Sequence, residues 1–277
     1  MSSTAAIGSL ALTAFYCCAL RAADAEQPVP VCGDTFAARF IDPETLERLR
    51  PALKFRGPAA SNVARHRIVD DIVRVALGKN PGMRIVLLGA GLDTRSFRLR
   101  GGQWWELEDP ALLAFKEERL PANTAPNPLM RVPVDFATAD LRQHLARLAG
   151  PGEALIVLEG VSMYLPAAAL TRSAAAVREA FPKAPIVCDL MSPAFQRRFA
   201  GGLHGALQGF GAHFAPDSAH PRLALEAAGY RMRSAVSIVG RARDAGSLRI
   251  PRWLLNSFLR ELRDGYSVCT FEPVGGG

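Results

Sequence analysis

The sequence predicts an α/β fold built on a doubly wound parallel sheet, and three observations predict it. From Arg84 onward, short apolar runs alternate with stretches of helical character. The first apolar run stops at Gly89-Ala90-Gly91, where a buried strand would turn into a loop. No internal repeat and no long linker divides the 277 residues, so we expect a single domain over residues 1–277.

A helical cap is predicted ahead of the sheet, over residues 1–60. Apolar residues at 5–20 predict a helix, and a proline-marked loop follows at 26–34. Residues 34–40 and 43–53 have the pattern of short helices, and residues 62–77 that of a longer one. The sheet then begins, with strands expected at 84–88, 104–108, 130–134, 154–158 and 185–190, and with helices at 110–120, 139–148 and 167–181 between them.

The C-terminal part departs from this alternation. Residues 192–221 are rich in glycine, histidine and phenylalanine and have no clear period, which predicts a lid or an insertion. A helix at 222–229, a strand at 230–238, a helix at 251–263 and a last strand at 266–271 are expected to follow.

The formal net charge of +7 comes from 33 basic residues, almost all of them arginines scattered singly along the chain. A nucleic-acid groove would concentrate basic residues on one element, so the scatter argues against nucleic acid as a partner. A positive field suits an acidic small-molecule substrate better. The association state expected is a monomer or a homodimer.

The cysteines and the N-terminus bear on the compartment. The five cysteines include no C-x-x-C pair, so the sequence indicates neither a disulfide framework nor a zinc site. We therefore expect no bound metal. Reduced thiols, as found in a cytoplasm, fit this cysteine pattern best. The apolar N-terminal run has no basic residue before Arg21, which favours a buried helix over a signal peptide. No other segment approaches the roughly 18 apolar residues of a membrane span, so no membrane is expected.

The loop after the first strand occupies the position where open α/β sheets bind ligands. Gly89 and Gly91 would let the backbone approach a ligand closely. A dinucleotide fingerprint would need a third glycine where Thr94 stands, and Asp93 would put negative charge where two phosphates belong. The loop therefore favours a ligand without a pyrophosphate, and a tight turn without any ligand is the alternative for this loop alone.

Acidic residues follow the next three strands. Glu106 and Glu108 point to one side of the second strand, and Glu108 ends it, where a carboxylate can accept both hydroxyls of a ribose. Asp135 and Phe136 follow the third strand and would offer adenine a polar edge and an apolar face. Glu159 follows the fourth strand directly. Taken alone, Glu108 could equally be a surface acid that precedes a helix. Taken together, these residues indicate one pocket for a ligand with a ribose, an adenine and an amino group.

These motifs resemble those of the leucine carboxyl methyltransferase family, which comprises class I S-adenosylmethionine enzymes including bacterial O-methyltransferases of secondary metabolism. The resemblance covers residues 30–190. It rests on LGAGLDTR at 88–95, ELEDP at 106–110 with Lys116, VPVD at 132–135, EGVSMYL at 159–165, and ARHR at 64–67 ahead of Asp70-Asp71. It implies a Rossmann-like class I methyltransferase sheet of seven strands with the last one antiparallel, a helical N-terminal cap and a lid insertion.

The resemblance also implies S-adenosylmethionine as the cofactor and a role for each matching residue. Arg65 would bind the cofactor carboxylate, the loop around Gly89 and Gly91 would pass under its methionine part, Glu108 would hold the ribose, and Glu159 the amino group or a nearby loop. The family usually has aspartate where Glu108 stands, and its eukaryotic members use an N-terminal lysine for which Arg21 is the nearest substitute here. The predicted cofactor-binding set is Arg65, Gly89, Ala90, Gly91, Asp93, Glu108, Asp135, Phe136, Glu159 and Gly160.

The reaction implied is an in-line methyl transfer, in which alignment and desolvation are the enzyme's main contributions. A carboxylate acceptor is already ionised at neutral pH and is the first expectation, with Arg197, Arg198 and Arg249 as possible partners. A phenol or alcohol would need a base. The candidate bases are Tyr164, His204, His213 and His220.

Two other functions remain open from the sequence. An NAD-dependent reductase is disfavoured by Thr94 and by Ala168, which stands where a Tyr-x-x-x-Lys pair starting at Tyr164 would have its lysine. A ligand-binding module of the same fold without catalytic activity is the other alternative.

Overall fold

The computed structural model describes residues 9–136, 140–199, 201, 205, 215 and 221–275. At its centre is a seven-stranded sheet in the order β3-β2-β1-β4-β5-β7-β6. β1 pairs in parallel with β2 and β4, whereas β7 runs antiparallel to β5 and β6, so the predicted sheet with an antiparallel last strand is confirmed. The strands are β1 (Arg84–Leu88), β2 (Gln103–Glu108), β3 (Leu129–Pro133), β4 (Ala154–Leu158), β5 (Ile186–Met191), β6 (Tyr230–Ser237) and β7 (Tyr266–Pro273).

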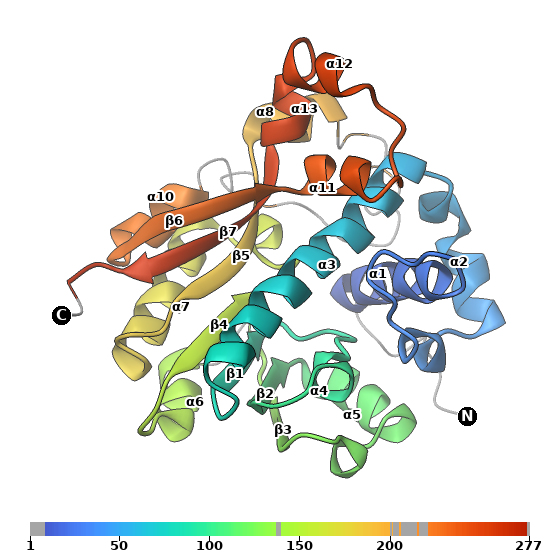
Figure 1. Cartoon of the computed structure of the whole chain (residues 1–277). Helices are drawn as coiled ribbons and strands as arrows, with labels where there is room; N and C mark the ends of the chain where they lie inside the picture. The colour runs from blue at the N-terminus through green and yellow to red at the C-terminus, as the bar shows by residue number, and fades with distance from the viewer. Residues whose placement is uncertain are drawn as a thin grey trace.

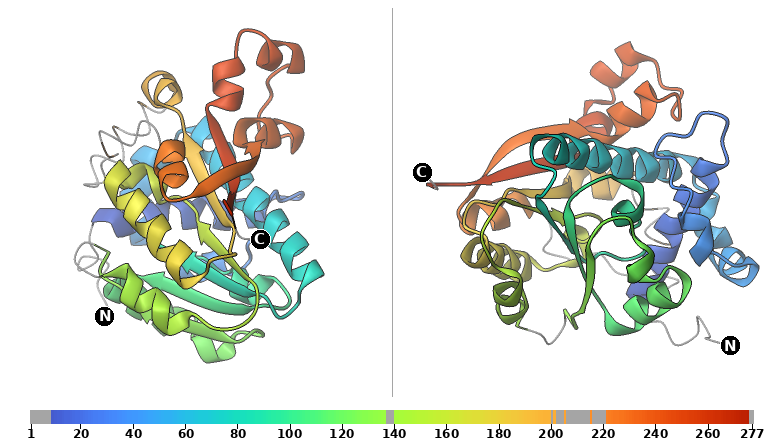
Figure 2. Two further views of the ribbon diagram at one scale, coloured as in Figure 1. Left: turned by 90° about the vertical axis from the view of Figure 1, so that its left-hand side faces the viewer. Right: turned by 60° about the horizontal axis from the view of Figure 1, so that its bottom comes forward.

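Helices cover both faces of the sheet. α3 (Arg56–Lys79) crosses one face, and α6 (Leu141–Leu148), α7 (Ala167–Ala180) and α10 (Pro221–Ala227) cover the other (Figures 1 and 2). Side chains of β1 alternate between two apolar clusters, with Ile85 and Leu87 on the α3 side and Val86 and Leu88 on the α7 side. This alternation explains why the central strands are apolar throughout.

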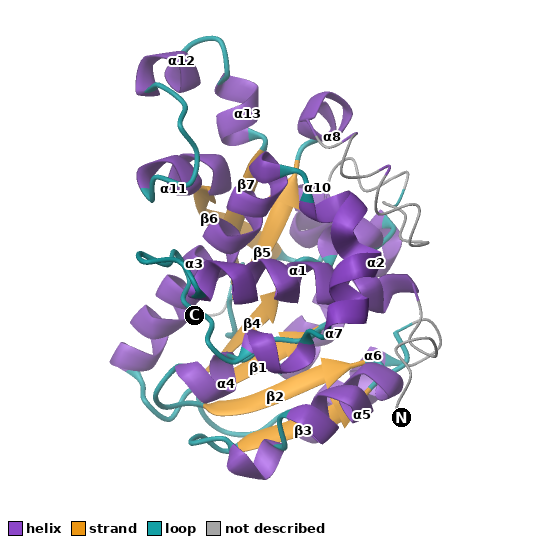
Figure 3. Cartoon of the chain, turned by 90° about the vertical axis from the view of Figure 1, so that its right-hand side faces the viewer, coloured by secondary structure: helices purple, strands orange, loops and turns teal. Residues whose placement is uncertain are grey.

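The N-terminal helices form a separate layer. α1 (Ser9–Ala25), η2 (Ala37–Phe40) and α2 (Pro43–Leu53) enclose a third apolar cluster with α5 (Pro110–Arg119) (Figure 3). Asp42 caps α2 by accepting a hydrogen bond from the Thr45 N–H at 2.7 Å. α1 reaches the loop after β1, where a Cβ at Gly91 would lie 3.4 Å from that of Ala14. None of the helices in the described part of the chain combines the length and apolarity that crossing a bilayer requires.

The connection between β1 and β3 is compact. It consists of α4 (Arg95–Arg98), β2, α5 and η3 (Ala122–Thr124). α5 begins as the sequence predicts, with Pro110 in its first turn and the Asp109 carboxylate accepting from the Ala111 N–H at 2.8 Å. This cap fixes the direction in which the chain leaves β2, immediately after Glu108.

One C-terminal prediction is wrong, and one helix was not predicted. The predicted strand 230–238 is β6, which ends one residue earlier, at Ser237. α11 (Ile238–Asp244) was not predicted, and the Ser237 hydroxyl caps it by accepting from the Gly240 N–H at 2.9 Å. The predicted helix 251–263 is interrupted and forms α12 (Arg252–Asn256) and α13 (Arg260–Asp264). Ser257 leaves helical geometry at this break, and its hydroxyl donates to the Trp253 carbonyl at 2.7 Å.

The sequence predicted the bounds of the N-terminal helices only in part, and the structure describes only part of the predicted lid. α3 starts earlier than predicted, at Arg56. Within the predicted lid 192–221, the structure describes α8 (Pro193–Phe199) and a few further residues, and the rest of that segment lies outside the described residues.

Candidate active site

A cavity of about 1140 Å³ opens at the carboxyl ends of β1, β2 and β4. This is where strand order reverses around β1, the position at which α/β sheets bind ligands. All ten predicted cofactor-binding residues line the cavity, as does Tyr164. They are Arg65, Gly89, Ala90, Gly91, Asp93, Glu108, Asp135, Phe136, Glu159 and Gly160.

The glycine loop is held close to β2. The N–H groups of Gly89 and Ala90 both donate to the Leu107 carbonyl, at 3.0 and 3.1 Å. Gly89 and Gly91 have φ values of +71° and +50°, which side chains other than glycine rarely adopt. A Cβ at Gly89 would also lie 2.6 Å from Cγ2 of Val161. Both the positive φ and the lack of space beside Val161 therefore require glycine at position 89.

Glu108 links the end of β2 to this loop. Its Oε2 accepts from the Gly91 N–H at 2.6 Å, and its Oε1 accepts from the Asp109 N–H at 2.8 Å. Burial raises the pKa of the Glu108 carboxyl, while these two N–H groups act in the opposite direction. A carboxylate offers about four acceptor positions, so two remain for a ligand hydroxyl pair.

The residues at the missing third glycine have structural partners. The Thr94 hydroxyl donates to Oδ1 of Asp34 at 2.6 Å, and Thr94 is fully buried. Asp93 accepts from the Arg95 N–H at 2.7 Å and pairs with the Arg95 guanidinium through its other oxygen. The negative charge of Asp93 is thus balanced within the protein.

Arg95 is the centre of a buried ion-pair network. Its guanidinium donates to Asp70 at 2.6 Å, to Glu159 at 2.7 Å and to Asp93. Burial alone would raise the pKa of Glu159, but the charge of Arg95, the hydrogen bond to the His66 ring and the charge of Arg65 outweigh it and hold this pKa well below its ordinary value. Glu159 is therefore an anion at neutral pH.

Arg98 and Arg21 extend the network toward the N-terminal helices. Arg98 donates to Asp70 at 2.8 Å, and Arg21 donates to Asp34 at 2.9 Å and to the Leu92 carbonyl at 2.6 Å. Burial opposes ionisation of Asp34, yet Arg21 and Arg98 lower its pKa to about 2. Arg21 thus ties α1 to the glycine loop, and it also lines the cavity.

His66, Asp93 and Glu159 offer atoms that lie within 4.8 Å of one another, a spacing that could hold a cation. The Arg95 guanidinium contacts all three: its Nη2 lies 2.7 Å from both Nδ1 of His66 and Oε2 of Glu159, and its Nη1 pairs with Asp93. The arginine therefore supplies the positive charge that a metal ion would bring to this cluster.

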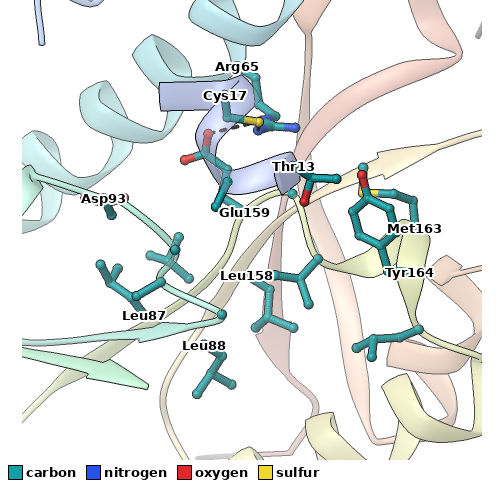
Figure 4. A pocket seen from close by; sticks show the side chains of 18 of the residues that line it. Thr13, Cys17, Arg65, Leu87, Leu88, Asp93, Leu158, Glu159, Met163 and Tyr164 are labelled. Carbon is teal, nitrogen blue, oxygen red and sulfur yellow. Dashed lines mark hydrogen bonds and ion pairs between the residues drawn. The ribbon is translucent and has the colours of Figure 1, made fainter. Parts of the chain in front are cut away.

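Arg65 joins the cavity to β5 and β7. Its Nε donates to Glu159 at 3.1 Å, and one terminal nitrogen donates to the Tyr266 hydroxyl at 2.8 Å and to Asp189 at 3.3 Å. The other terminal nitrogen lies 3.7 Å from Sγ of Cys17, and Figure 4 shows Arg65, Cys17 and Glu159 gathered on one side of the pocket. A guanidinium has five N–H groups, so these contacts leave one for a ligand carboxylate.

Asp189 and Tyr266 are functional neighbours that the sequence reasoning missed. Asp189 is fully buried, accepts from the Tyr266 hydroxyl at 2.7 Å and from the Gly160 N–H at 2.6 Å, and so positions both Arg65 and the turn after β4. The signal for Asp189 was a charged residue inside the apolar run of β5. Tyr266 carries no such signal, because an aromatic residue at the start of a strand is ordinary.

The acids of β2 and the residues after β3 have different surroundings. Glu106 is fully buried and pairs with Lys116 at 2.7 Å and with Arg131 at 3.1 Å, so it supports the sheet edge and does not line the cavity. Asp135 and Phe136 do line it, and Phe136 is 42% exposed, which leaves its ring open to a ligand.

The structure places some of the candidate bases and carboxylate partners and leaves others outside the described residues. Burial raises the pKa of Tyr164 above its ordinary value, so its hydroxyl stays protonated at neutral pH. His204, His213 and His220 lie outside the described residues. None of Arg197, Arg198 and Arg249 lines the cavity, and Arg198 pairs with Glu261 at the surface at 3.3 Å, so these three arginines are not placed to hold an acceptor carboxylate there.

Comparison with known proteins gives one family match. Residues 14–177 match the model of the family described as leucine carboxyl methyltransferase. A relative from Streptomyces coelicolor, provisionally named an S-adenosyl-L-methionine-dependent methyltransferase, is 30% identical over 59% of this chain and 60% of its own length. A relative from Mycolicibacterium paratuberculosis with the same provisional name is 33% identical over 58% of this chain and 57% of its own length. The chain thus spans about three-fifths of the length of these relatives.

Solved structures show the same fold at low identity. The magnesium protoporphyrin IX methyltransferase of Synechocystis PCC 6803, with bound SAH, superposes with a TM-score of 0.51 at 12% identity over 87% of this chain and 100% of its own. A DUF574 family protein from Streptomyces avermitilis superposes with a TM-score of 0.57 at 10% identity over 94% of this chain and 97% of its own. Together the matches confirm the predicted family resemblance and fold, and the names of the two relatives include the predicted cofactor.

Proposed function

Because this chain belongs to the leucine carboxyl methyltransferase family, we propose that it binds S-adenosylmethionine in the cavity at the ends of β1, β2 and β4 and methylates a carboxylate of a small molecule. The observation that carries the proposal is the convergence of all ten predicted cofactor residues on one cavity. Its volume of about 1140 Å³ exceeds the roughly 300–1,000 Å³ of pockets that hold one ligand, so it has room for a cofactor and an acceptor.

The residues present fit this cofactor. The loop Gly89-Ala90-Gly91 lines the cavity without a side chain larger than a methyl group, and Glu108 keeps acceptor positions for two ribose hydroxyls. Arg65 keeps one N–H for a carboxylate, and Glu159 is an anion beside it. Asp135 and Phe136 supply the polar and apolar groups that adenine needs.

A carboxylate acceptor is favoured by the titration state of the cavity. Among the described lining residues, Tyr164 is a protonated phenol and Glu159 is a carboxylate held by two arginines. Burial and the charge of Arg95 lower the pKa of His66, but its ring is only 2% exposed and contacts Arg95 and Arg98. None of these groups is placed to deprotonate a hydroxyl, whereas a carboxylate needs no base.

The apolar part of the cavity supports the same choice. S-adenosylmethionine supplies a methyl group on a positively charged sulfur, and its transfer to a carboxylate oxygen breaks the carbon–sulfur bond and leaves two neutral groups. Water solvates the charged reactants better than the neutral products, so a cavity wall that excludes water favours the transfer. The chain's own residues would hold the two reactants in line.

The proposal is tested by binding and by product analysis. We expect the whole protein to bind S-adenosylmethionine in a calorimetric titration and to add one methyl group to carboxylic acids, detected by mass. A carboxylate reaction would stay constant above about pH 6, while a histidine-assisted reaction on a phenol would lose rate as pH falls through about 6.5. Binding of NADH without binding of S-adenosylmethionine would overturn the proposal.

A further inference from the structure

The cavity has a second, apolar end that the cofactor residues do not occupy. Phe195 and Phe199 of α8 line it, as do Leu248, Ile250 and Leu262 from the segment that joins β6 to β7. Each of these side chains is a hydrocarbon without a polar atom. The opposite end of the cavity carries Asp93, Glu108, Asp135, Glu159 and Arg65, so the two ends differ sharply in polarity.

The segment that builds much of this wall is longer than the sheet requires. Ser237 of β6 and Ser267 of β7 are direct partners in an antiparallel pair, which a two-residue turn could close. The chain instead inserts residues 238–265, which form α11, α12 and α13. We call residues 238–265 the β6–β7 insertion. α13 packs next to α8 (Figures 1 and 3). Side chains of both the insertion and α8 line the cavity.

The wall is held by aromatic contacts to the cofactor end. The ring of Phe195 lies 5.5 Å from that of Phe199 and 5.6 Å from that of Tyr266. Tyr266 in turn donates to Asp189 and accepts from Arg65. The rings of Phe195 and Tyr266 therefore connect the apolar end to the groups proposed to bind the cofactor.

Four side chains of the apolar end remain partly exposed. Phe199, Leu248, Ile250 and Leu262 are neither fully buried nor surface residues, whereas Phe195 is 7% exposed. Apolar area left open inside a cavity gains free energy when a ligand of the same character covers it. Methionine side chains of Met163 and Met191 complete the lining, and such side chains adapt to ligands of different shapes.

From these observations we propose that the acceptor is an amphiphilic carboxylic acid, whose apolar body lies against α8 and the β6–β7 insertion and whose carboxylate faces the cofactor end. The proposal rests on the proposed function and adds the substrate class to it. An acid with a polar or charged group on its body would have to bury that group in the apolar end without a partner, which is strongly unfavourable.

The test is a series of straight-chain acids, from butanoic to decanoic, titrated into the whole protein with and without S-adenosylhomocysteine. We expect the affinity to rise by about fourfold for each added methylene until the wall is covered. Octanedioic acid, which matches octanoic acid in length but carries a second carboxylate, should bind far more weakly. Equal affinity for all chain lengths, or equal binding of the dicarboxylic acid, would overturn the proposal.

A matched pair of variants locates the effect. Leu262 and Leu259 are both partly buried leucines of the insertion, but only Leu262 lines the cavity. Leu262→Gln should weaken decanoic acid binding by about tenfold and leave butanoic acid unchanged, while Leu259→Gln should change neither. Phe199→Ala serves the same purpose if Leu262→Gln does not fold.

The outcomes separate the two proposals. Loss of S-adenosylhomocysteine binding with chain-length dependence intact would overturn the proposed function and keep the apolar binding site. Normal S-adenosylhomocysteine binding with no chain-length dependence would overturn the amphiphilic acceptor alone.

Discussion

The two ends of the cavity are stabilised by different interactions. The cofactor end is built from buried charges, with Arg95, Asp70 and Glu159 paired at 2.6 to 2.7 Å. The acceptor end is an apolar wall from α8 and the β6–β7 insertion, with partly exposed side chains such as Leu262. Removing one member of a buried charged network leaves its partners unpaired, whereas trimming a partly exposed apolar wall loses only contact area. Changes at the cofactor end should therefore affect folding, and changes at the acceptor end should affect binding.

The largest effect is expected at the centre of the buried network. Arg95→Met should lower the free energy of unfolding by about 3–5 kcal/mol, because Asp93 would lose its cation while remaining buried. Denaturant unfolding followed by circular dichroism measures this. Arg233→Met is the control, because the Arg233 side chain is 71% exposed and its pair with Glu272 spans 3.9 Å. Equal stability of the two variants would show that the buried network stabilises the fold no more than an exposed ion pair does.

A substitution of Glu108 tests whether the cofactor end binds the cofactor as well as stabilising the fold. Glu108→Gln should weaken S-adenosylhomocysteine binding roughly 100-fold, since hydrogen bonds to a charged group contribute about 1.5–3 kcal/mol each. The amide nitrogen would also face one of the two N–H groups from Gly91 and Asp109. Calorimetry gives the affinity, and Glu118→Gln, on the exposed side of α5, provides the control. Unchanged affinity in Glu108→Gln would contradict the assigned ribose contact.

Gly89 separates backbone strain from steric overlap. Gly89→Ala and Gly246→Ala place an alanine at similar φ values, +71° and +78°, but only the first meets a neighbour. Both should lose about 1 kcal/mol of stability from the left-handed conformation, and Gly89→Ala should lose about 1–3 kcal/mol more from contact with Val161. Thermal unfolding measures the difference, and Val161→Ala in the Gly89→Ala background should restore part of it. No difference between the two glycine variants would show that the loop has room at Gly89.

The smallest effect is a pH dependence of the buried network. Burial and Arg95 lower the pKa of His66, so the folded protein prefers the neutral ring. The unfolded chain binds a proton near pH 6.5, so stability should be fully present above that pH and decline as pH falls through about 6.5 toward the folded pKa. Denaturant midpoints measured between pH 8 and pH 5 test this sign. His66→Gln should reduce the slope, and a slope that is unchanged in that variant would assign it to other groups.

The difference between the ends also explains what the sequence could predict. Gly89 and Glu159 follow their strands directly, Glu108 ends β2, and Asp135 lies two residues after β3. The register of a parallel sheet therefore brings them together once the strands are located. The apolar wall depends on Leu248, Ile250 and Leu262, which are ordinary apolar residues. No element was predicted at Leu248 and Ile250, and Leu262 falls in the predicted helix 251–263. Nothing local distinguishes them from core residues, and the helix α11 was missed because its cap, Ser237, also reads as the last residue of a strand.

Long-range partners were the other limit. Arg65 meets Tyr266 across 201 positions of the sequence, and the pairing exists only because β7 lies beside β5 in the sheet. Sequence reasoning identified Arg65 from its motif but not the groups that hold it. Pairing between distant residues requires the strand order, which the alternation of elements leaves undetermined.

The β6–β7 insertion has a consequence for how this scaffold can be altered. It leaves and re-enters the sheet at two directly paired residues, Ser237 and Ser267, so the strand register does not depend on what lies between them. Lengthening such a segment adds little closure entropy, about 0.6 kcal/mol for each doubling. Within the insertion, Ile238 and Ala242 of α11 are fully buried in the cluster that packs on α3, so α11 belongs to the core. Exchange is therefore confined to the part after α11, which carries Leu248, Ile250 and Leu262, and would change one wall of the cavity while the strand ends that hold the cofactor residues remain in place.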